Sequence, residues 1–163
     1  MSGQGTIVVG VDGSKSSEAA LRWAVAEAAA TRRDVLVMTA WSQVVAADAG
    51  APGQPVDDLV AAHRAAQQKV LEAVARPDVT IRGEIVEGDP TDVLLTASDG
   101  ADLLVLGTHG RGAVMRTLLG SVSARCLRKA NCPVVVLPLR AVAPEGTATH
   151  EAAAMDYAPG PVL

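Results

Sequence analysis

Aromatic residues are almost absent from this chain. Its 163 residues include no phenylalanine, two tryptophans and one tyrosine, although 49% of them are hydrophobic. The core must therefore be built from valine, leucine, isoleucine and alanine, a composition that suits a parallel sheet covered by alanine-rich helices. The same scarcity argues against a stacking platform for single-stranded nucleic acid, and we expect no nucleic-acid partner.

Long apolar runs and cysteines are also scarce. No apolar run approaches the length that spans a bilayer, so we expect no association with a membrane. The N-terminus has neither a charged region nor a long apolar segment, which favours a cytoplasmic protein. The only cysteines, Cys126 and Cys132, are too few for a disulfide framework, and we interpret them as small buried hydrophobes.

Acidic residues are missing from one long stretch. Residues 103–144 contain no aspartate or glutamate, in a chain whose formal net charge is -4. A local positive field in an acidic chain indicates a specific anionic ligand. We interpret Arg125, Arg128 and Lys129 as solvated cations late in a helix, whereas for Arg111, in a loop, a ligand-facing role and a solvated one are evenly balanced. The basic residues of the stretch are Arg111, Arg116, Arg125, Arg128, Lys129 and Arg140.

The order of elements within this stretch favours a phosphate site. An apolar run, 103–106, ends at Gly107, and a loop with further glycines follows. A helical pattern then begins at 120–123, Gly-Ser-Val-Ser, before a second apolar run at 134–137. Glycines after a strand let backbone N–H groups approach a ligand closely. Serines at a helix start add donors where the helix dipole favours negative charge.

The whole chain alternates strand and helix patterns, which predicts a doubly wound α/β domain over residues 5–139. We expect a mobile excursion over 42–55 and a flexible tail over 140–163. Helices are expected after the serines at 14–17, from about Leu59 to before Pro77, after a capping Asp89 and after Gly120. Strands are predicted at 6–11, 35–40, 79–86, 103–106 and 134–137, with the alternating run 79–86 near an edge of the sheet.

Two features follow the first predicted strand. The segment 13–16, Gly-Ser-Lys-Ser, lacks the upstream glycine of a Walker phosphate loop, so we interpret it as a plain strand-to-helix turn. Asp12 is different, because a carboxylate at a strand end can accept a hydrogen bond from a sugar hydroxyl or an adenine amine. Ligands of doubly wound sheets bind at such strand ends, so we favour a ligand role for Asp12 over that of a turn residue alone.

The glycines have the spacing G-x2-G-x9-G-S, from Gly107 through Gly110 and Gly120 to Ser121. With the segments 6–14, 88–90 and 131–138, this pattern resembles the ATP-binding branch of the universal stress protein family. The resemblance covers essentially residues 5–139. It implies a five-stranded parallel sheet of order 3-2-1-4-5 with helices on both faces, and a homodimer paired through the strand 134–138.

The resemblance also implies an ATP site, with Mg or Mn accompanying the phosphates. Asp12 would contact the adenosine end, and the backbone of Ala40 would meet the adenine edge. The glycine loop would wrap the ribose and phosphates, and the following helix start would hold the phosphate tail. The nucleotide-binding residues implied in this way are Gly10, Asp12, Ala40, Gly107, Thr108, His109, Gly110, Arg111, Gly112, Gly120, Ser121, Val122 and Ser123.

We therefore expect an ATP-binding regulatory protein of the universal stress type. The alternative is an enzyme, a slow ATPase or nucleotide-transferring hydrolase using the same pocket, in which His109 would be the general base. That segment offers no carboxylate to orient the imidazole, so we assign no catalytic residue. A third possibility is an interaction module whose glycine loop is vestigial.

Overall fold

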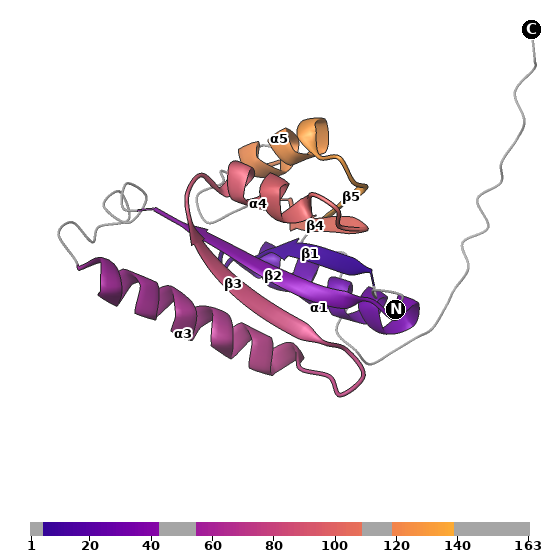
Figure 1. The fold of residues 1–163 in the computed structure, drawn as a ribbon, viewed down its shortest axis with the longest axis horizontal. Coiled ribbons are helices and arrows are strands. Elements are labelled where there is room, and N and C mark those ends of the chain that lie inside the picture. Colours follow the sequence, from indigo (N-terminus) through magenta and orange to yellow (C-terminus); the bar gives the residue numbers. More distant parts are fainter. Residues whose placement is uncertain (1–4, 43–54, 109–118, 139–163) are drawn as a thin grey trace, which may run out of the picture.

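The computed structural model of the protein describes residues 5–42, 55–108 and 119–138. Strands and helices alternate through these ranges (Figure 1). The helices are α1 (Lys15–Thr31), α3 (Val56–Val74), α4 (Pro90–Ser98) and α5 (Ser121–Lys129). The strands are β1 (Thr6–Gly10), β2 (Asp34–Trp41), β3 (Ile81–Glu87), β4 (Leu103–Gly107) and β5 (Val134–Leu137).

The strands form one parallel sheet of order β3-β2-β1-β4-β5, which confirms the predicted order. The central strand β1 is a continuous apolar run because it is buried on both faces, with Ile7, Val8 and Val9 each 0% exposed. The alternating pattern around 79–86 correctly predicted an edge position, since β3 lies at one edge and β5 at the other.

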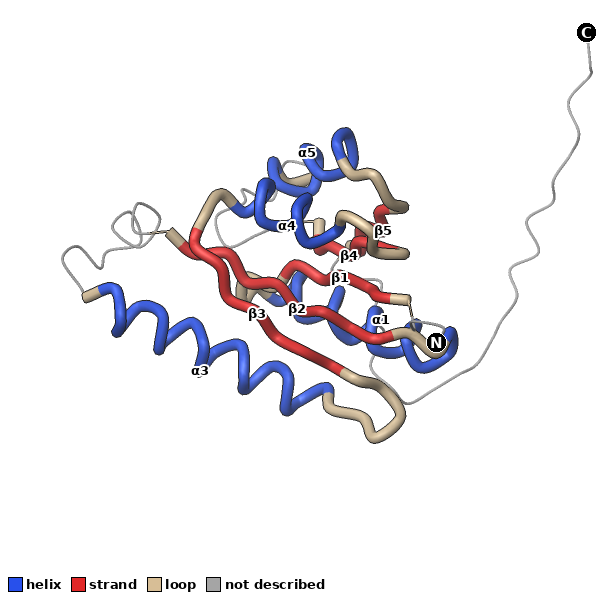
Figure 2. The backbone as a smooth tube through the Cα atoms, in the orientation of Figure 1, coloured by secondary structure: helices blue, strands red, loops and turns tan. Residues whose placement is uncertain are grey.

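Helices cover both faces of the sheet, α1 and α3 on one side and α4 and α5 on the other (Figure 2). Side chains alternate along each strand, so Val9 of β1 packs in the core under α1 while Val8 packs under α4 and α5. Cys126 of α5 is fully buried in that second core, and burial raises the pKa of its thiol. Cys132 is half-buried beside it, which agrees with the interpretation of both as small hydrophobes.

The element boundaries differ slightly from those predicted. Strand β3 begins at Ile81, because Val79 first takes part in a turn in which its N–H donates to the carbonyl of Arg76 at 3.4 Å. Helix α3 begins at Val56, earlier than the start expected near Leu59, and it ends before Pro77 as expected. No helix of the described ranges is long and apolar enough to cross a bilayer. Residues 43–54 of the predicted excursion and the predicted tail lie outside the described residues.

Candidate functional site

The strand order reverses between β1 and β4, and the predicted site lies at the carboxyl ends of these strands. The structure places the described members of the predicted set along this edge, on the turn after β1, at the end of β2, and on the segments that follow β4 and open α5. The remaining predicted members lie outside the described residues: His109, Gly110, Arg111 and Gly112.

The turn after β1 is built from its own polar side chains. The Asp12 carboxylate accepts a hydrogen bond from the backbone N–H of Ser14 at 3.0 Å, and Gly13 has a φ of 80°. Ser14 then caps α1, accepting from the backbone N–H of Ser17 at 3.2 Å. The interpretation of 13–16 as a strand-to-helix turn is therefore confirmed. Asp12 itself is exposed at the edge of the sheet.

The two strand-end glycines have packing reasons of their own. A methyl group on Gly107 would lie 2.7 Å from the carbonyl carbon of Ser16, because the first turn of α1 passes directly over the end of β4. A methyl group on Gly10 would lie 2.9 Å from Leu106 and 3.0 Å from Leu94. From the sequence, ligand binding was the only reason we found for these two glycines. The structure shows that neighbouring elements also require both residues to be small.

Two hydrogen bonds join the start of the glycine loop to its end. The Gly120 N–H donates to the Thr108 carbonyl at 2.6 Å, and the Ser123 hydroxyl donates to the Gly107 carbonyl at 2.8 Å. The N–H of Thr108 in turn donates to Leu137 of β5 at 3.1 Å. Ser123 is buried, and its hydroxyl proton is directed at Gly107. Its observed contact therefore fixes the loop ends to each other.

The N-terminus of α5 differs from those of α1 and α4. Asp89 caps α4 by accepting from the N–H groups of Thr91 at 2.9 Å and Asp92 at 3.3 Å, as the sequence predicted. The N-cap of α5 is Gly120, which has no side chain to accept such bonds, and the first turn of α5 contains no acid. The first-turn N–H groups and the exposed Ser121 therefore remain suited to an anion from outside the helix.

One cation near this helix start is already paired. Arg125 of α5 lies 3.6 Å from the Asp89 carboxylate, so it forms an ion pair where solvation was expected. Burial by itself raises the pKa of the Asp89 carboxyl. The hydrogen bonds from the N–H groups of Asp92 and Thr91, together with the Arg125 guanidinium, outweigh burial and hold that pKa below its usual value. Arg128 and Lys129 lie exposed in the last turn of α5, as predicted.

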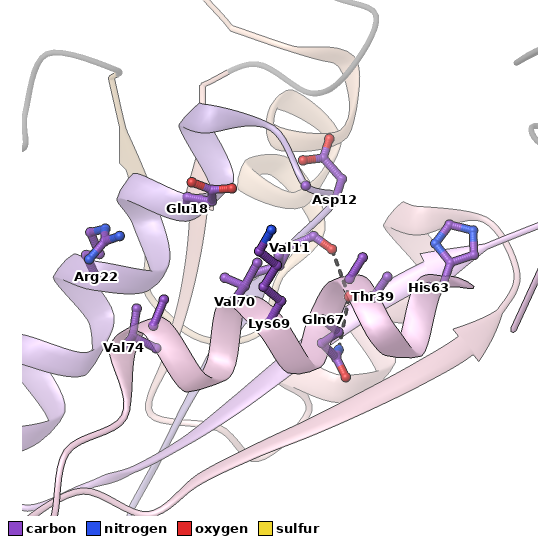
Figure 3. A pocket seen from close by; sticks show the side chains of 13 residues that line it. Val11, Asp12, Glu18, Arg22, Thr39, His63, Gln67, Lys69, Val70 and Val74 are labelled. Carbon is purple, nitrogen blue, oxygen red and sulfur yellow. Dashed lines mark hydrogen bonds between the residues drawn. The ribbon is translucent and has the colours of Figure 1, made fainter. Parts of the chain in front are cut away.

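A cavity of about 360 Å³ opens between α1 and α3, beginning at Asp12 (Figure 3). Of the predicted site residues that the structure describes, Asp12 alone lines it, so it extends away from α5 on the other face of the sheet. Two buried polar residues, Thr39 and Gln67, lie in its wall, and the sequence reasoning missed both. The sequence did contain a signal for Gln67. Leu59, Val70 and Val74 mark the apolar face of α3, and Gln67 is a polar residue on that same face.

The described ranges contain no group of three or more His, Cys, Asp or Glu side chains that could hold a metal ion.

Comparison with known proteins agrees with this architecture. The sequence model of the Universal stress protein family matches residues 5–138. Universal stress protein Rv2005c of Mycobacterium tuberculosis is 36% identical over an alignment of 142 residues, and the match covers 80% of this chain and 47% of the relative. Universal stress protein Rv2624c of the same organism is 32% identical over an alignment of 144 residues, and the match covers 84% of this chain and 51% of the relative. The chain thus spans about half the length of these relatives.

Solved structures give the same result. A universal stress protein in complex with cAMP is 32% identical, with a TM-score of 0.57, and the match covers 85% of this chain and 99% of that one. A protein of the universal stress protein family from Burkholderia pseudomallei is 29% identical, with a TM-score of 0.62, covering 85% of this chain and 98% of that one. This chain therefore belongs to the universal stress protein family.

Proposed function

We propose that this protein binds an adenine nucleotide, ATP with Mg or Mn, at the carboxyl edge of β1 and β4, and acts as a nucleotide-dependent module of the stress response. The observation that carries the proposal is the start of α5. Its first-turn N–H groups lack a side-chain cap from Gly120, and the Thr108–Gly120 hydrogen bond fixes them beside the end of β4. Such a helix start favours phosphate through both its N–H groups and its dipole.

The nucleoside end would lie toward β1 and β2. The exposed Asp12 carboxylate would accept from a ribose hydroxyl or from the adenine amine, and the backbone of Ala40, near the end of β2, would meet the adenine edge. The phosphates would follow β4 to the N–H groups at Ser121, Val122 and Ser123 and to the Ser121 hydroxyl. A divalent ion would supply the charge that neutralises the phosphates.

The comparison with a similar universal stress protein in complex with cAMP supports adenine nucleotides as the ligand class. Because cAMP carries a single cyclic phosphate, the part that it shares with ATP is mainly the adenosine. The comparison therefore supports mainly the nucleoside end of the proposed site. The match covers only about half of the relatives Rv2005c and Rv2624c. Our proposal for this chain therefore rests on its own site and not on the activity or partners of those longer proteins.

We propose binding without rapid hydrolysis. Hydrolysis needs an oriented water and a charge clamp on the departing phosphoryl group. The first turn of α5 contains no acid, Asp89 is engaged as the cap of α4, and Asp12 would be occupied at the nucleoside end. A slow ATPase stays the alternative, and measured phosphate release with and without the His109→Ala change tests it.

The substitution Ser121→Asp tests the phosphate site. A carboxylate in the first turn of α5 suits the helix dipole, so the melting temperature should hold or rise. The same charge would repel the phosphates, and we expect ATP affinity to fall by about tenfold or more. Ser121→Asn is the matched control, because it is similar in size and uncharged. ATP binding by Ser121→Asp as tight as that of the unmodified protein would contradict the placement of the phosphates.

A further inference from the structure

Gln67 is a buried polar residue in a helix that is otherwise largely exposed. The buried residues of α3 are Leu59, Gln67 and Val74, and Gln67 is only 6% exposed. Its side chain reaches from the helix toward the sheet at the wall of the α1–α3 cavity (Figure 3). A buried amide must be hydrogen-bonded to avoid a desolvation cost, so its partners show what it holds in place.

The partners of the Gln67 amide belong to two strands. Nε2 donates to the Glu84 carbonyl of β3 at 2.9 Å and to the Thr39 hydroxyl of β2 at 3.0 Å, with the Val37 carbonyl at 3.3 Å. The amide oxygen lies over Gly83, where a methyl group would be 2.5 Å from it. The lack of a side chain at Gly83 therefore makes room for the amide, and Gln67 joins α3 to the paired strands.

The hydrogen bond from Gln67 fixes the direction of the Thr39 hydroxyl. Because the Thr39 oxygen accepts from Nε2, its single proton is available to the Val11 carbonyl, at 2.9 Å. The N–H of Val11 donates to the Met38 carbonyl, also at 2.9 Å. Both backbone polar groups of Val11 are thus bonded to β2, one through the strand backbone and one through the Gln67–Thr39 pair.

This chain of hydrogen bonds ends beside both proposed nucleoside contacts. Val11 directly precedes Asp12, and Thr39 directly precedes Ala40. We infer that Gln67 and Thr39 are positioning residues for the nucleotide site, which hold the ends of β1 and β2 in the arrangement that presents Asp12 and Ala40 to the nucleoside. The inference rests on the proposed function and extends it to α3, on the face of the sheet opposite α5.

Two substitutions of Thr39 separate positioning from packing. Thr39→Val keeps the shape and suits a strand, but it removes the hydroxyl. Thr39→Ser keeps the hydroxyl and removes a methyl group. If Thr39 serves only packing, the valine variant should resemble the unmodified protein more closely than the serine variant does. If Thr39 serves positioning, the serine variant should bind nucleotide almost as tightly as the unmodified protein, and the valine variant should bind more weakly.

The measurement is titration calorimetry of the full chain with ATP and Mg²⁺, and separately with AMP, alongside the melting temperature of each variant. We expect Thr39→Val to bind both nucleotides about fivefold to tenfold more weakly, and Thr39→Ser to bind within about twofold of the unmodified protein. An equal loss for ATP and AMP is expected because the affected contacts lie at the nucleoside end.

Gln67→Met gives a second variant should the valine variant not fold, and we expect it to weaken both nucleotides by a similar factor. The control is Gln68→Met on the same helix. There the exposed amide donates to the Glu72 carboxylate at 2.9 Å, and no change in affinity is expected. Unchanged affinity in the folded Thr39→Val and Gln67→Met variants would overturn the inference alone. Failure of the unmodified protein to bind either nucleotide would overturn the proposed function and, with it, this inference.

Discussion

At the end of β4, Gly107 is in contact with the first turn of α1, and this packing gives the residue a role that is independent of any ligand. A side chain there would meet the backbone of Ser16, which cannot rotate away. A side chain at Gly10 would meet only the ends of Leu94 and Leu106, which can change rotamer. The two strand-end glycines should therefore respond differently to the same added methyl group.

We expect Gly107→Ala to lower the free energy of unfolding by about 2 kcal/mol, because the helix start must shift to accept the methyl group. Gly10→Ala, the matched control, should cost clearly less. Urea denaturation of both variants measures the difference. Equal losses in the two variants would mean that the α1 backbone does not restrict position 107 as the contact indicates.

Local contacts were predictable at this scale, and distant ones were not. Ser14 and Asp89 were identifiable as caps because each accepts from N–H groups two or three residues away in the sequence. The hydrogen-bond partners of Gln67 and Thr39 lie 17 to 30 residues away in the sequence, and the sequence pattern contains no signal for such pairs. The same limit explains why we had attributed Gly107 to ligand binding alone. Its contact with Ser16 depends on how α1 crosses the sheet, which the sequence pattern does not reveal.

Helix α4 shows how a single cap stabilises an element. Asp89 accepts two backbone hydrogen bonds and lies 3.6 Å from Arg125 of α5, so it fixes the start of α4 and pairs with the neighbouring helix. These interactions hold the pKa of its carboxyl below the usual value in the folded protein. A group with a lowered folded-state pKa stabilises the fold above its unfolded pKa, and this contribution is lost as the pH falls through the folded pKa.

Near neutral pH we expect Asp89→Ala to lower the free energy of unfolding by about 1 kcal/mol, through loss of the cap. The difference from the unmodified protein should shrink in acid, once the native carboxylate becomes protonated. Urea denaturation in a series of increasingly acidic buffers tests both parts. Asp89→Asn, which keeps an acceptor oxygen, should lose less at neutral pH. A difference that grows with acidity would contradict the assigned protonation state.

The elements themselves were predictable because apolar periodicity is strong in this chain. Continuous runs identified β1, β2, β4 and β5, and their alternation with helices predicted the doubly wound sheet. The boundary of β3 was misplaced because Val79 is buried like a strand residue while its backbone forms a turn. Hydrophobic pattern reports burial, and it cannot distinguish a buried turn residue from the first residue of a strand.

The whole molecule has an apolar edge at β5. Residues 134–136 are half-buried, and β5 pairs with β4 on one side only in the described sheet. An exposed apolar edge strand is prone to pair with another chain, so we propose that two copies pair through residues 134–138 about a two-fold axis. Each copy would then cover the other's edge.

Light scattering on the unmodified protein should therefore give the mass of a dimer. Val136→Asp should give a monomer. Pairing through β5 would bury one added carboxylate from each copy at the shared edge, and this burial of like charges opposes pairing. Thr80→Asp places the same charge next to the opposite edge strand and should leave the dimer intact. Melting temperatures of both variants confirm that they fold. A monomer mass for the unmodified protein, or a dimer mass for folded Val136→Asp, would contradict pairing through β5.

At the carboxyl edge of the sheet, Asp12 and the start of α5 would receive opposite ends of one nucleotide. Titration calorimetry of nucleotide-free protein with ATP and Mg²⁺ tests it most directly, with GTP as the comparison for the adenine edge. We expect ATP to bind at one site per chain with a net free energy of about 8 kcal/mol, in the micromolar range, and GTP to bind more weakly. The absence of binding heat for ATP at several temperatures, in folded protein from which no nucleotide was extracted, would contradict the claim.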